Sequence, residues 1–221
     1  MNPIPEEIER FGRAVGPRPD PLIAELDEYA QRESFPTVGP AVGGWLQLLA
    51  GLVGAERIFE FGSGFGYSAC WFARALPEDG EIVLTEVDAD ELDQAREFLD
   101  RGGYADIARF ERGDAIEIVE RYDGPFDVVL IDNEKHRYAE AFESVRAKVA
   151  QGGVIVADNA IATDRMDFPG LLALVEGDDP GEIGDHARGV AEYLERVRSD
   201  PGFETAVVPL GEGIAVSRRV A

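Results

Sequence analysis

The stretch "RIFEFGSGFGYSA", residues 57–69, decides the fold of this chain. Its first part, Arg57–Phe61, is mostly apolar and aromatic, which predicts a buried strand. Glycines at alternate positions follow, and a helical pattern then covers Tyr67–Leu76. Such glycines let the chain turn sharply and let a ligand approach the backbone, while the free N–H groups of the next helix can hold an anion. The stretch therefore predicts a strand, a tight turn and a helix arranged around a ligand.

The same order of strand and helix repeats along most of the chain. Further strands are predicted at Ile82–Val87, Ile107–Glu111, Phe126–Ile131 and Val154–Ala157. Further helices are predicted at Ala89–Arg101, Ala115–Arg121 and Arg137–Ala150. Repeated β-α units with short loops indicate a parallel sheet with helices on both faces. Two last strands, Phe203–Leu210 and Gly213–Val220, are so closely linked that they must form an antiparallel hairpin. The predicted fold is α/β, with a seven-stranded, mostly parallel sheet.

The chain is predicted to be one domain over residues 1–221. Residues 1–55 have helical character and precede the first strand, and residues 56–221 form the core. The helices predicted in the first part are Asp20–Glu33 and Val42–Leu52, with Pro36 and Pro40 breaking the pattern between them. Residues 160–185 are rich in Gly, Asp and Pro and are predicted to be a long loop, of the kind that often serves as a lid.

Carboxylates dominate the charge of the chain. There are 44 Asp and Glu against 21 Lys and Arg, which gives a net charge of -23. Only Lys135 and Lys148 are lysines. A field this negative repels phosphate backbones, so no nucleic-acid partner is expected. An acidic, lysine-poor surface resembles that of proteins from salt-loving organisms, where high salt screens the self-repulsion.

Three further features indicate a cytoplasmic protein without a membrane partner. No apolar run reaches the roughly 20 residues of a membrane span. The first residues, "MNPIPEEIERFGRAVG", are acidic and lack the apolar core of a signal peptide. A single cysteine, Cys70, excludes a framework of internal disulfides.

Acidic residues beside the glycine turn indicate which ligand it binds. Glu60 comes two residues before the first glycine, and the second strand ends at Glu86, where a carboxylate can accept from ribose hydroxyls. The third strand leads into Asp114 and Ala115, where an adenine edge would lie. The glycines themselves are Gly62, Gly64 and Gly66. This combination resembles the S-adenosylmethionine site of class I methyltransferases. A dinucleotide site would also use the glycines and Glu86, but it would not explain Glu60 or the Gly-Asp-Ala sequence.

Two strand ends supply a second group of polar side chains. The fourth strand leads into "IDNEKHRY", which provides Asp132, and the fifth ends in "GGVIVADN", which provides Asp158 and Asn159. Because the carboxyl ends of parallel strands meet at one edge, we expect these side chains to lie together. Two carboxylates and an amide oxygen suit Mg²⁺ or Ca²⁺ and fit zinc poorly. Three protein ligands would leave about three octahedral positions for substrate and water.

Lys135 follows Asp132 by three residues, in a chain that otherwise uses arginine. A lysine amine can lose its proton at workable pH and act as a general base, whereas a guanidinium cannot. The alternative is an exposed lysine at the start of a helix. That alternative is disfavoured because a cation there opposes the helix dipole. We therefore interpret Lys135 as the base of the site.

Four blocks of sequence together resemble the cation-dependent O-methyltransferase family, which includes catechol and plant caffeoyl-CoA O-methyltransferases and small bacterial enzymes. The blocks are residues 45–77, "IDNEKHRY" at 131–138, "GGVIVADN" at 152–159 and "VPLGEGIAVSRR" at 208–219. The resemblance covers about Phe35 to Val220. It implies Asp132, Asp158 and Asn159 as metal ligands and Lys135 as catalytic base. The implied contacts to the methyl donor are Val38, Glu60, Gly62, Ser68, Glu86, Ala115, Asp132 and Glu134. It also implies a homodimer formed through the N-terminal helices.

The expected activity is transfer of a methyl group from S-adenosylmethionine to one hydroxyl of a small, catechol-like vicinal diol, with a divalent cation, Mg²⁺ in the first place, as cofactor. We expect the substrate's two hydroxyls to chelate the cation, and Lys135 to remove the proton of the attacking one. Residues 161–185 show no counterpart of the family's substrate-gripping loop, so the acceptor stays open. Three alternatives remain: a metal-independent methyltransferase, a non-catalytic S-adenosylmethionine-binding protein and an NAD-dependent oxidoreductase.

Overall fold

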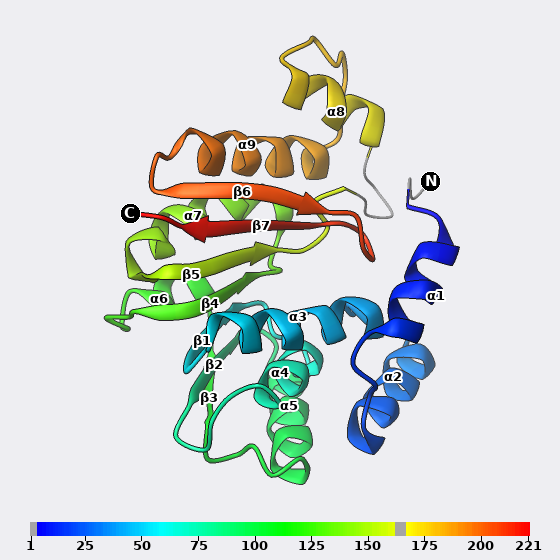
Figure 1. Ribbon diagram of the computed structural model, residues 1–221, viewed down its shortest axis with the longest axis vertical. Coiled ribbons are helices and arrows are strands. Elements are labelled where there is room, and N and C mark those ends of the chain that lie inside the picture. Colours follow the sequence, from blue (N-terminus) through cyan, green and yellow to red (C-terminus); the bar gives the residue numbers. More distant parts are fainter. Residues whose placement is uncertain (1–3, 162–166) are drawn as a thin grey trace.

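The computed structural model describes residues 4–161 and 167–221, and these residues contain a seven-stranded sheet with helices on both faces (Figure 1). The strands, in chain order, are β1 Arg57–Phe61, β2 Glu81–Glu86, β3 Ala108–Arg112, β4 Phe126–Ile131, β5 Val149–Ala157, β6 Phe203–Val208 and β7 Ile214–Arg219. Their order across the sheet is β3-β2-β1-β4-β5-β7-β6. All neighbours pair in parallel except β7, which is antiparallel to both β5 and β6. The predicted sheet is thus confirmed.

Helices surround this sheet, and several of them begin at a side-chain cap or with a proline in the first turn. They are α1 Glu6–Val15, α2 Pro21–Glu33, α3 Gly39–Val53, α4 Tyr67–Ala73, α5 Ala89–Arg101, α6 Ala115–Val119, α7 Tyr138–Val145, α8 Phe168–Glu176 and α9 Asp185–Ser199, with short 3-10 turns η1 Lys135–Arg137 and η2 Arg146–Lys148. Asp20 and Asp88 accept backbone N–H groups at the starts of α2 and α5. Pro40 lies in the first turn of α3, where its missing N–H costs nothing.

The continuous apolar run of β4 follows from its two buried faces. Val128 and Leu130 pack into a core with α2, α3, α4 and α5. Val129 and Ile131 pack into a second core with α6, α7, α8 and α9. Because successive side chains point to opposite sides of a strand, a strand covered on both faces needs apolar residues at every position. The same arrangement holds the carboxyl end of β4 in the middle of the sheet.

The predicted loop at 160–185 is wrong in part, because α8 forms within it. Leu171 of α8 is buried in the core beside α9, so the apolar segment gains more from a packed helix than from a loop. In Figure 1, α8 lies outside α9, at the far side from the sheet. Residues 162–166, which the lid prediction also includes, lie outside the described residues. Helix α9 was not predicted, although Ala187, Val190, Leu194 and Val197 are buried at helical spacing.

The N-terminal helices pack beside the glycine turn. The Tyr67 hydroxyl donates to Asp27 of α2 at 2.5 Å, and the rings of Phe35 and Phe65 lie 4.9 Å apart, edge to face. Helix α1 lies along the same side of the molecule as the β6–β7 turn (Figure 1). The helical extension therefore forms one wall of the space at the carboxyl edge of the sheet. No helix in the described part of the chain is both long enough and apolar enough to span a membrane.

Candidate active site

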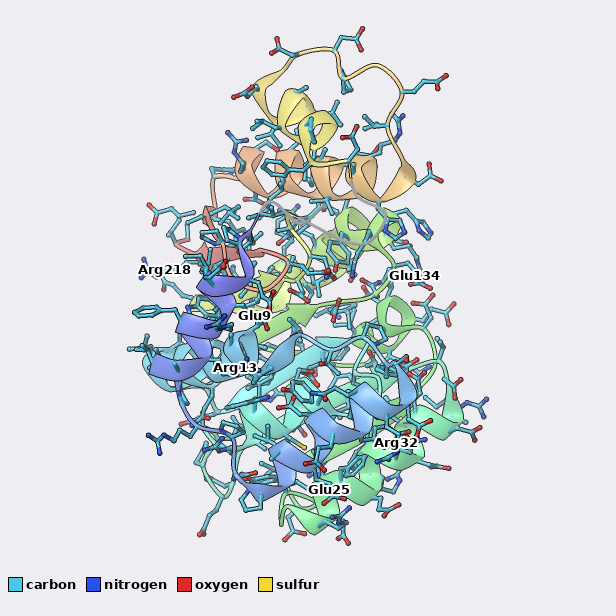
Figure 2. The ribbon with its side chains drawn as sticks, turned by 90° about the vertical axis from the view of Figure 1, so that its right-hand side faces the viewer. Glu9, Arg13, Glu25, Arg32, Glu134 and Arg218 are labelled. Atoms are coloured by element: carbon cyan, nitrogen blue, oxygen red, sulfur yellow. The ribbon has the colours of Figure 1, made fainter. Side chains whose placement is uncertain are left out.

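A cavity of about 1010 Å³ lies at the carboxyl edge of the sheet. Figure 2 faces this edge, and it shows Glu9 of α1 and Glu134, just beyond β4, on opposite sides of the centre. The predicted site residues that line the cavity are Val38, Gly62, Gly64, Ser68, Glu86, Asp114, Ala115, Asp132, Glu134, Lys135, Asp158 and Asn159. The fold thus brings the glycine turn and the polar strand ends into one space.

The glycine turn depends on backbone conformations that other residues avoid. Gly62 and Gly64 have φ values of 80° and 50°. A Cβ on Gly62 would lie 2.8 Å from the backbone oxygen of Asp132, so the turn after β1 can approach the end of β4 only without a side chain. Gly66 does not line the cavity; its missing Cβ lets α4 pack against Ala95 and Leu99 of α5. The prediction that all three glycines face the ligand is therefore not supported for Gly66.

Glu86 is fixed by the backbone of the turn itself. One carboxylate oxygen accepts from the N–H of Gly64 at 3.0 Å, and the other accepts from the N–H groups of Val87 and Asp88 at 2.7 and 3.1 Å. The carboxylate therefore stands at the mouth of the turn in a set orientation. Partial burial, together with the charge of Glu86, raises the pKa of neighbouring Glu91 to about 7. This part of the cavity favours a neutral, hydroxyl-rich group over a phosphate.

Glu60 lies fully buried beneath the turn, behind the cavity lining. Neither of its carboxylate oxygens has a hydrogen-bond partner of normal geometry among the described residues. Burial raises the pKa of Glu60 to about 8; the nearby Ser68 hydroxyl offsets part of this rise, and the charge of Asp132 adds to it. An acid this costly to ionise in the free protein is suited to a cationic ligand group.

Asp114 joins the end of β3 to the segment that carries Lys135. One of its oxygens accepts from the N–H of Ile116 at 2.9 Å and so caps α6, and the other accepts from Arg137 at 2.8 Å. Burial raises the pKa of Asp114, but these hydrogen bonds lower it by more. The net pKa of Asp114 is therefore below its ordinary value. Both carboxylate oxygens of Asp114 thus already accept hydrogen bonds. Ala115, the other residue of the predicted adenine contact, lines the cavity beside it.

Asp132 and Asp158 form an acidic pair with one ammonium partner. The Lys135 ammonium lies 2.9 Å from an Asp132 oxygen, and its side chain is only 12% exposed. Asp158 is 5% exposed, and its Oδ1 has no hydrogen-bond partner among the described residues. Burial raises the pKa of both carboxyl groups, and the charge of Asp132 raises that of Asp158 further. The site is short of positive charge, which a bound cation would supply.

Asn159 adds a neutral oxygen next to this pair. Its backbone is in the left-handed region, with φ 54°, which asparagine tolerates better than most residues. Its side-chain amide donates to Glu212 in the β6–β7 turn. The set of two carboxylates and one amide fits a hard, oxygen-preferring divalent ion. No group of three or more His, Cys, Asp and Glu side chains in residues 4–161 and 167–221 is arranged to hold a metal, so this mixed set is the candidate.

Residues outside the predicted set hold these groups in place. The Tyr138 hydroxyl donates to the backbone oxygen of Asp158 at 3.2 Å, and its ring lies 5.0 Å from the Lys135 ammonium. A Cβ on Gly189 of α9 would lie 2.3 Å from the backbone oxygen of Lys135, so α9 packs directly on η1. Glu9 and Glu212 also line the cavity. Tyr138 and Glu212 lie within blocks already noted in the sequence, whereas Glu9 and Gly189 gave no local signal.

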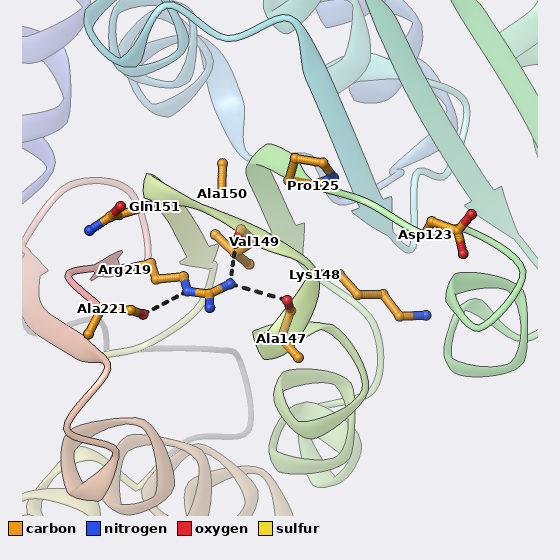
Figure 3. Close-up of a pocket in the computed structure, with 9 residues that line it drawn as sticks. All are labelled: Asp123, Pro125, Ala147, Lys148, Val149, Ala150, Gln151, Arg219 and Ala221. Carbon is orange, nitrogen blue, oxygen red and sulfur yellow. Dashed lines mark hydrogen bonds between the residues drawn. The ribbon is translucent and has the colours of Figure 1, made fainter.

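A second hollow, of about 470 Å³, lies at the amino end of the sheet (Figure 3). Its cationic groups are already paired. The Arg219 guanidinium donates to the backbone oxygens of Ala147, Val149 and Ala221, and Lys148 donates to Val119. These hydrogen bonds to backbone oxygens hold the end of β7 against the start of β5.

The fold is that of the class I methyltransferases, and comparison with known proteins gives the family. Residues 17–220 match the model of the O-methyltransferase family. A catechol O-methyltransferase of Niastella koreensis is 36% identical over 75% of this chain and 77% of its own. Tricin synthase 2 of Oryza sativa is 28% identical over 93% of this chain and 72% of its own. An O-methyltransferase from Streptomyces achromogenes, solved with S-adenosylmethionine, superimposes with a TM-score of 0.83 at 25% identity over 97% of this chain and 96% of its own.

The chain therefore belongs to the O-methyltransferase family and is an S-adenosylmethionine-dependent O-methyltransferase. An enzyme from Bacillus cereus in complex with S-adenosylhomocysteine shares the fold, with a TM-score of 0.82 over 96% of this chain and 97% of its own. The dinucleotide-binding alternative from the sequence is set aside by this membership.

Proposed function

We propose that this enzyme methylates one hydroxyl of a small, catechol-like vicinal diol, with a divalent cation held by Asp132, Asp158 and Asn159. The observation that carries the proposal is the unpartnered, buried Oδ1 of Asp158 beside an acid that has only one ammonium partner. A buried carboxylate oxygen without a donor is expensive unless a ligand completes it. Mg²⁺ is the first candidate because the three donors are all oxygen.

Lys135 is the proposed base. Its amine lies at the rim of the acidic pair, where it can reach a hydroxyl placed between Asp132 and Asp158. A divalent cation bound there would supply Lewis acidity, which lowers the pKa of a coordinated hydroxyl. In its neutral form Lys135 then accepts the hydroxyl proton, and Asp132 stabilises the resulting ammonium. Packing of Gly189 on η1 keeps the amine in this place.

The glycine turn is the proposed site of the methyl donor. Glu86 lies where ribose hydroxyls can donate to it, Glu60 lies beneath the turn as a counter-charge, and Ala115 borders the adenine position. The other proposed donor contacts are Val38, Gly62, Gly64, Ser68, Asp114, Asp132 and Glu134, all of which line the same cavity. Since both substrates share one cavity, the chain can hold the acceptor oxygen in line with the methyl group, and this positioning provides much of the rate.

Several properties of the whole protein belong to the same proposal. The exposed apolar side chains on α1 and α3 are Ile8, Phe11, Val15, Leu48 and Leu52. They support a homodimer formed through these helices. The net charge of -23 supports a salt-loving source and argues against a nucleic-acid partner. We further propose a single domain and a cytoplasmic location.

Methyl transfer from labelled S-adenosylmethionine to a panel of catechols, in high salt, tests this function. Activity with Mg²⁺ that disappears in excess EDTA and returns with added Mg²⁺ would support the proposal. Activity that ignores EDTA would remove the metal and leave a metal-independent methyltransferase. No turnover of any catechol, with S-adenosylhomocysteine still bound, would exclude the acceptor class.

A further inference from the structure

Glu212 lies at the tip of the β6–β7 turn, far from Asn159 in the sequence, yet the two side chains meet at the edge of the acidic pair. We propose that Glu212 is a positioning residue that turns the Asn159 amide oxygen toward Asp132 and Asp158. This inference rests on the proposed metal site. It adds a residue that acts through Asn159 and does not itself bind the ion.

The direction of the Asn159 amide follows from the chemistry of the contact. An ionised carboxylate can only accept hydrogen bonds, so the group that faces Glu212 must be the NH₂ of Asn159. The carbonyl oxygen of the same amide then lies on the other side of the Cβ–Cγ bond, away from Glu212. Without this contact the amide is free to rotate by half a turn. Its NH₂ group would then face the acidic pair and repel a cation bound there. Glu212 thus selects the one orientation in which Asn159 is a metal ligand.

The backbone holds the turn against Asn159 as well. The N–H groups of Ala160 and Ile161 donate to the backbone oxygens of Gly213 and Glu212 at 2.8 and 3.0 Å. A Cβ on Gly213 would lie 2.4 Å from Ile161, so this approach requires glycine, whose φ here is 88°. Two hydrogen bonds directly after Asn159 therefore set the distance across which its amide and Glu212 meet. The hairpin that ends the fold serves in this way as the support of a metal ligand.

A direct ligand role for Glu212 is disfavoured by the same geometry. Asp132, Asp158 and Glu212 do not form a cluster of three acids that can hold one ion, within the described residues. The carboxylate of Glu212 is instead directed to the amide. Its loss should therefore weaken metal binding by releasing Asn159, by the roughly 10- to 100-fold typical of groups that orient metal ligands.

Calorimetric titration of the full chain with Mn²⁺ in high salt tests the inference without relying on turnover. We expect Glu212→Ala to weaken Mn²⁺ binding about 10- to 100-fold. Glu212→Gln should lose less, because its amide oxygen still accepts. The matched control is Glu204→Gln, which removes one charge from the exposed start of β6 in the same hairpin. It should bind Mn²⁺ like the wild type.

A second variant separates positioning from direct action on the ion. Asn159→Gly removes the amide and still allows the left-handed backbone. If Glu212 acts through Asn159, Glu212→Ala adds no loss of Mn²⁺ affinity in the Asn159→Gly background. Additive losses, or an unchanged affinity in Glu212→Ala alone, would overturn the positioning role. A wild-type chain that binds no Mn²⁺ at all would instead overturn the metal site of the proposed function.

Discussion

The two ends of the sheet differ in whether their acidic side chains have hydrogen-bond or ion-pair partners. At the amino end, Asp127 accepts the N–H groups of Glu56 and Arg57 at 2.9 Å, and Arg57 pairs with Glu81 at 3.1 Å. At the carboxyl end, Glu60 is buried without a hydrogen bond of normal geometry, and Asp158 keeps an oxygen without one. The unbalanced carboxylates mark where ligands must complete the structure.

The largest expected effect comes from comparing the two lysines. Lys135 lies at the carboxyl end of the sheet and Lys148 at the amino end. Lys135→Arg keeps a cation next to Asp132 but removes a group that can deprotonate. Methyl transfer should fall at least ~100-fold, the lower range for loss of a general base. Turnover under saturating donor and Mg²⁺ is the measurement.

The control for that variant is Lys148→Arg at the amino end. Lys148 donates to the backbone oxygen of Val119 at 2.7 Å and lies outside the cavity. Its replacement should leave turnover unchanged. A Lys135→Arg enzyme within tenfold of the wild type would rule out Lys135 as the base.

Glu60 gives a prediction on stability and pH. The pKa of Glu60 is about 8 in the fold, against an ordinary value of 4.5. Between these values the folded chain keeps a proton that the unfolded chain has released. Stability from this group therefore falls as pH rises from 4.5 and is lowest above 8. Glu60→Gln should nearly match the wild type near pH 5 and exceed it by about 4–5 kcal/mol at pH 9, at ~1.4 kcal/mol per pKa unit.

Urea unfolding of the donor-free and metal-free chain at the two pH values measures this effect. Glu81→Gln at the amino end is the matched control, since it removes an acid that is half-buried and paired with Arg57. Its loss should cost at most about 1 kcal/mol at either pH. If Glu60→Gln gains nothing at pH 9, Glu60 is ionised without penalty and the contrast between the two ends is weaker than described.

Local patterns in the sequence were sufficient for the sheet, and they identified twelve residues that line one cavity. The strands Arg57–Phe61 and Phe126–Ile131 were predicted with their observed ends, because glycine or acidic residues terminate each apolar run abruptly. Strand β5 begins at Val149 and not at the predicted Val154, because it continues across an irregularity near Gly152 that interrupts the pattern.

Contacts between distant segments were the part that local patterns could not supply. The meeting of Glu212 with Asn159 depends on how the last hairpin packs. Likewise, Glu9 lines the cavity only because α1 packs at the carboxyl edge of the sheet. Helix α9 has buried residues at helical spacing, but its contact with the backbone of Lys135 depends on packing between distant segments.

Gly189 tests whether that packing sets the carboxyl-end geometry. Gly189→Ala should normally favour a helix, yet its Cβ would meet the backbone of Lys135 at 2.3 Å. We expect a loss of about 1–3 kcal/mol of stability, as for other overpacked sites, together with a rise in the Mg²⁺ needed for activity.

The control is Gly51→Ala in α3, where a Cβ would meet nothing within 4 Å. It should gain up to about 1 kcal/mol, the ordinary helix preference of alanine over glycine. Thermal unfolding and Mg²⁺ dependence of turnover distinguish the two variants. Equal behaviour of both alanine variants would show that η1 can move away without consequence.

The smallest expected effect concerns two buried or half-buried tyrosines at opposite ends of the sheet. Tyr138→Phe removes the hydroxyl that donates to the Asp158 backbone at 3.2 Å, and Tyr122→Phe removes one that donates to Glu111 at 2.9 Å. Each should cost about 1 kcal/mol of stability, the usual net value of one hydrogen bond. Only Tyr138→Phe should also raise the Mg²⁺ concentration for half-maximal activity, by a few-fold, since only its partner is a proposed ligand. A parallel rise in Tyr122→Phe would mean that metal binding reports general stability, and the special character of the carboxyl end would then rest on Lys135 and Glu60 alone.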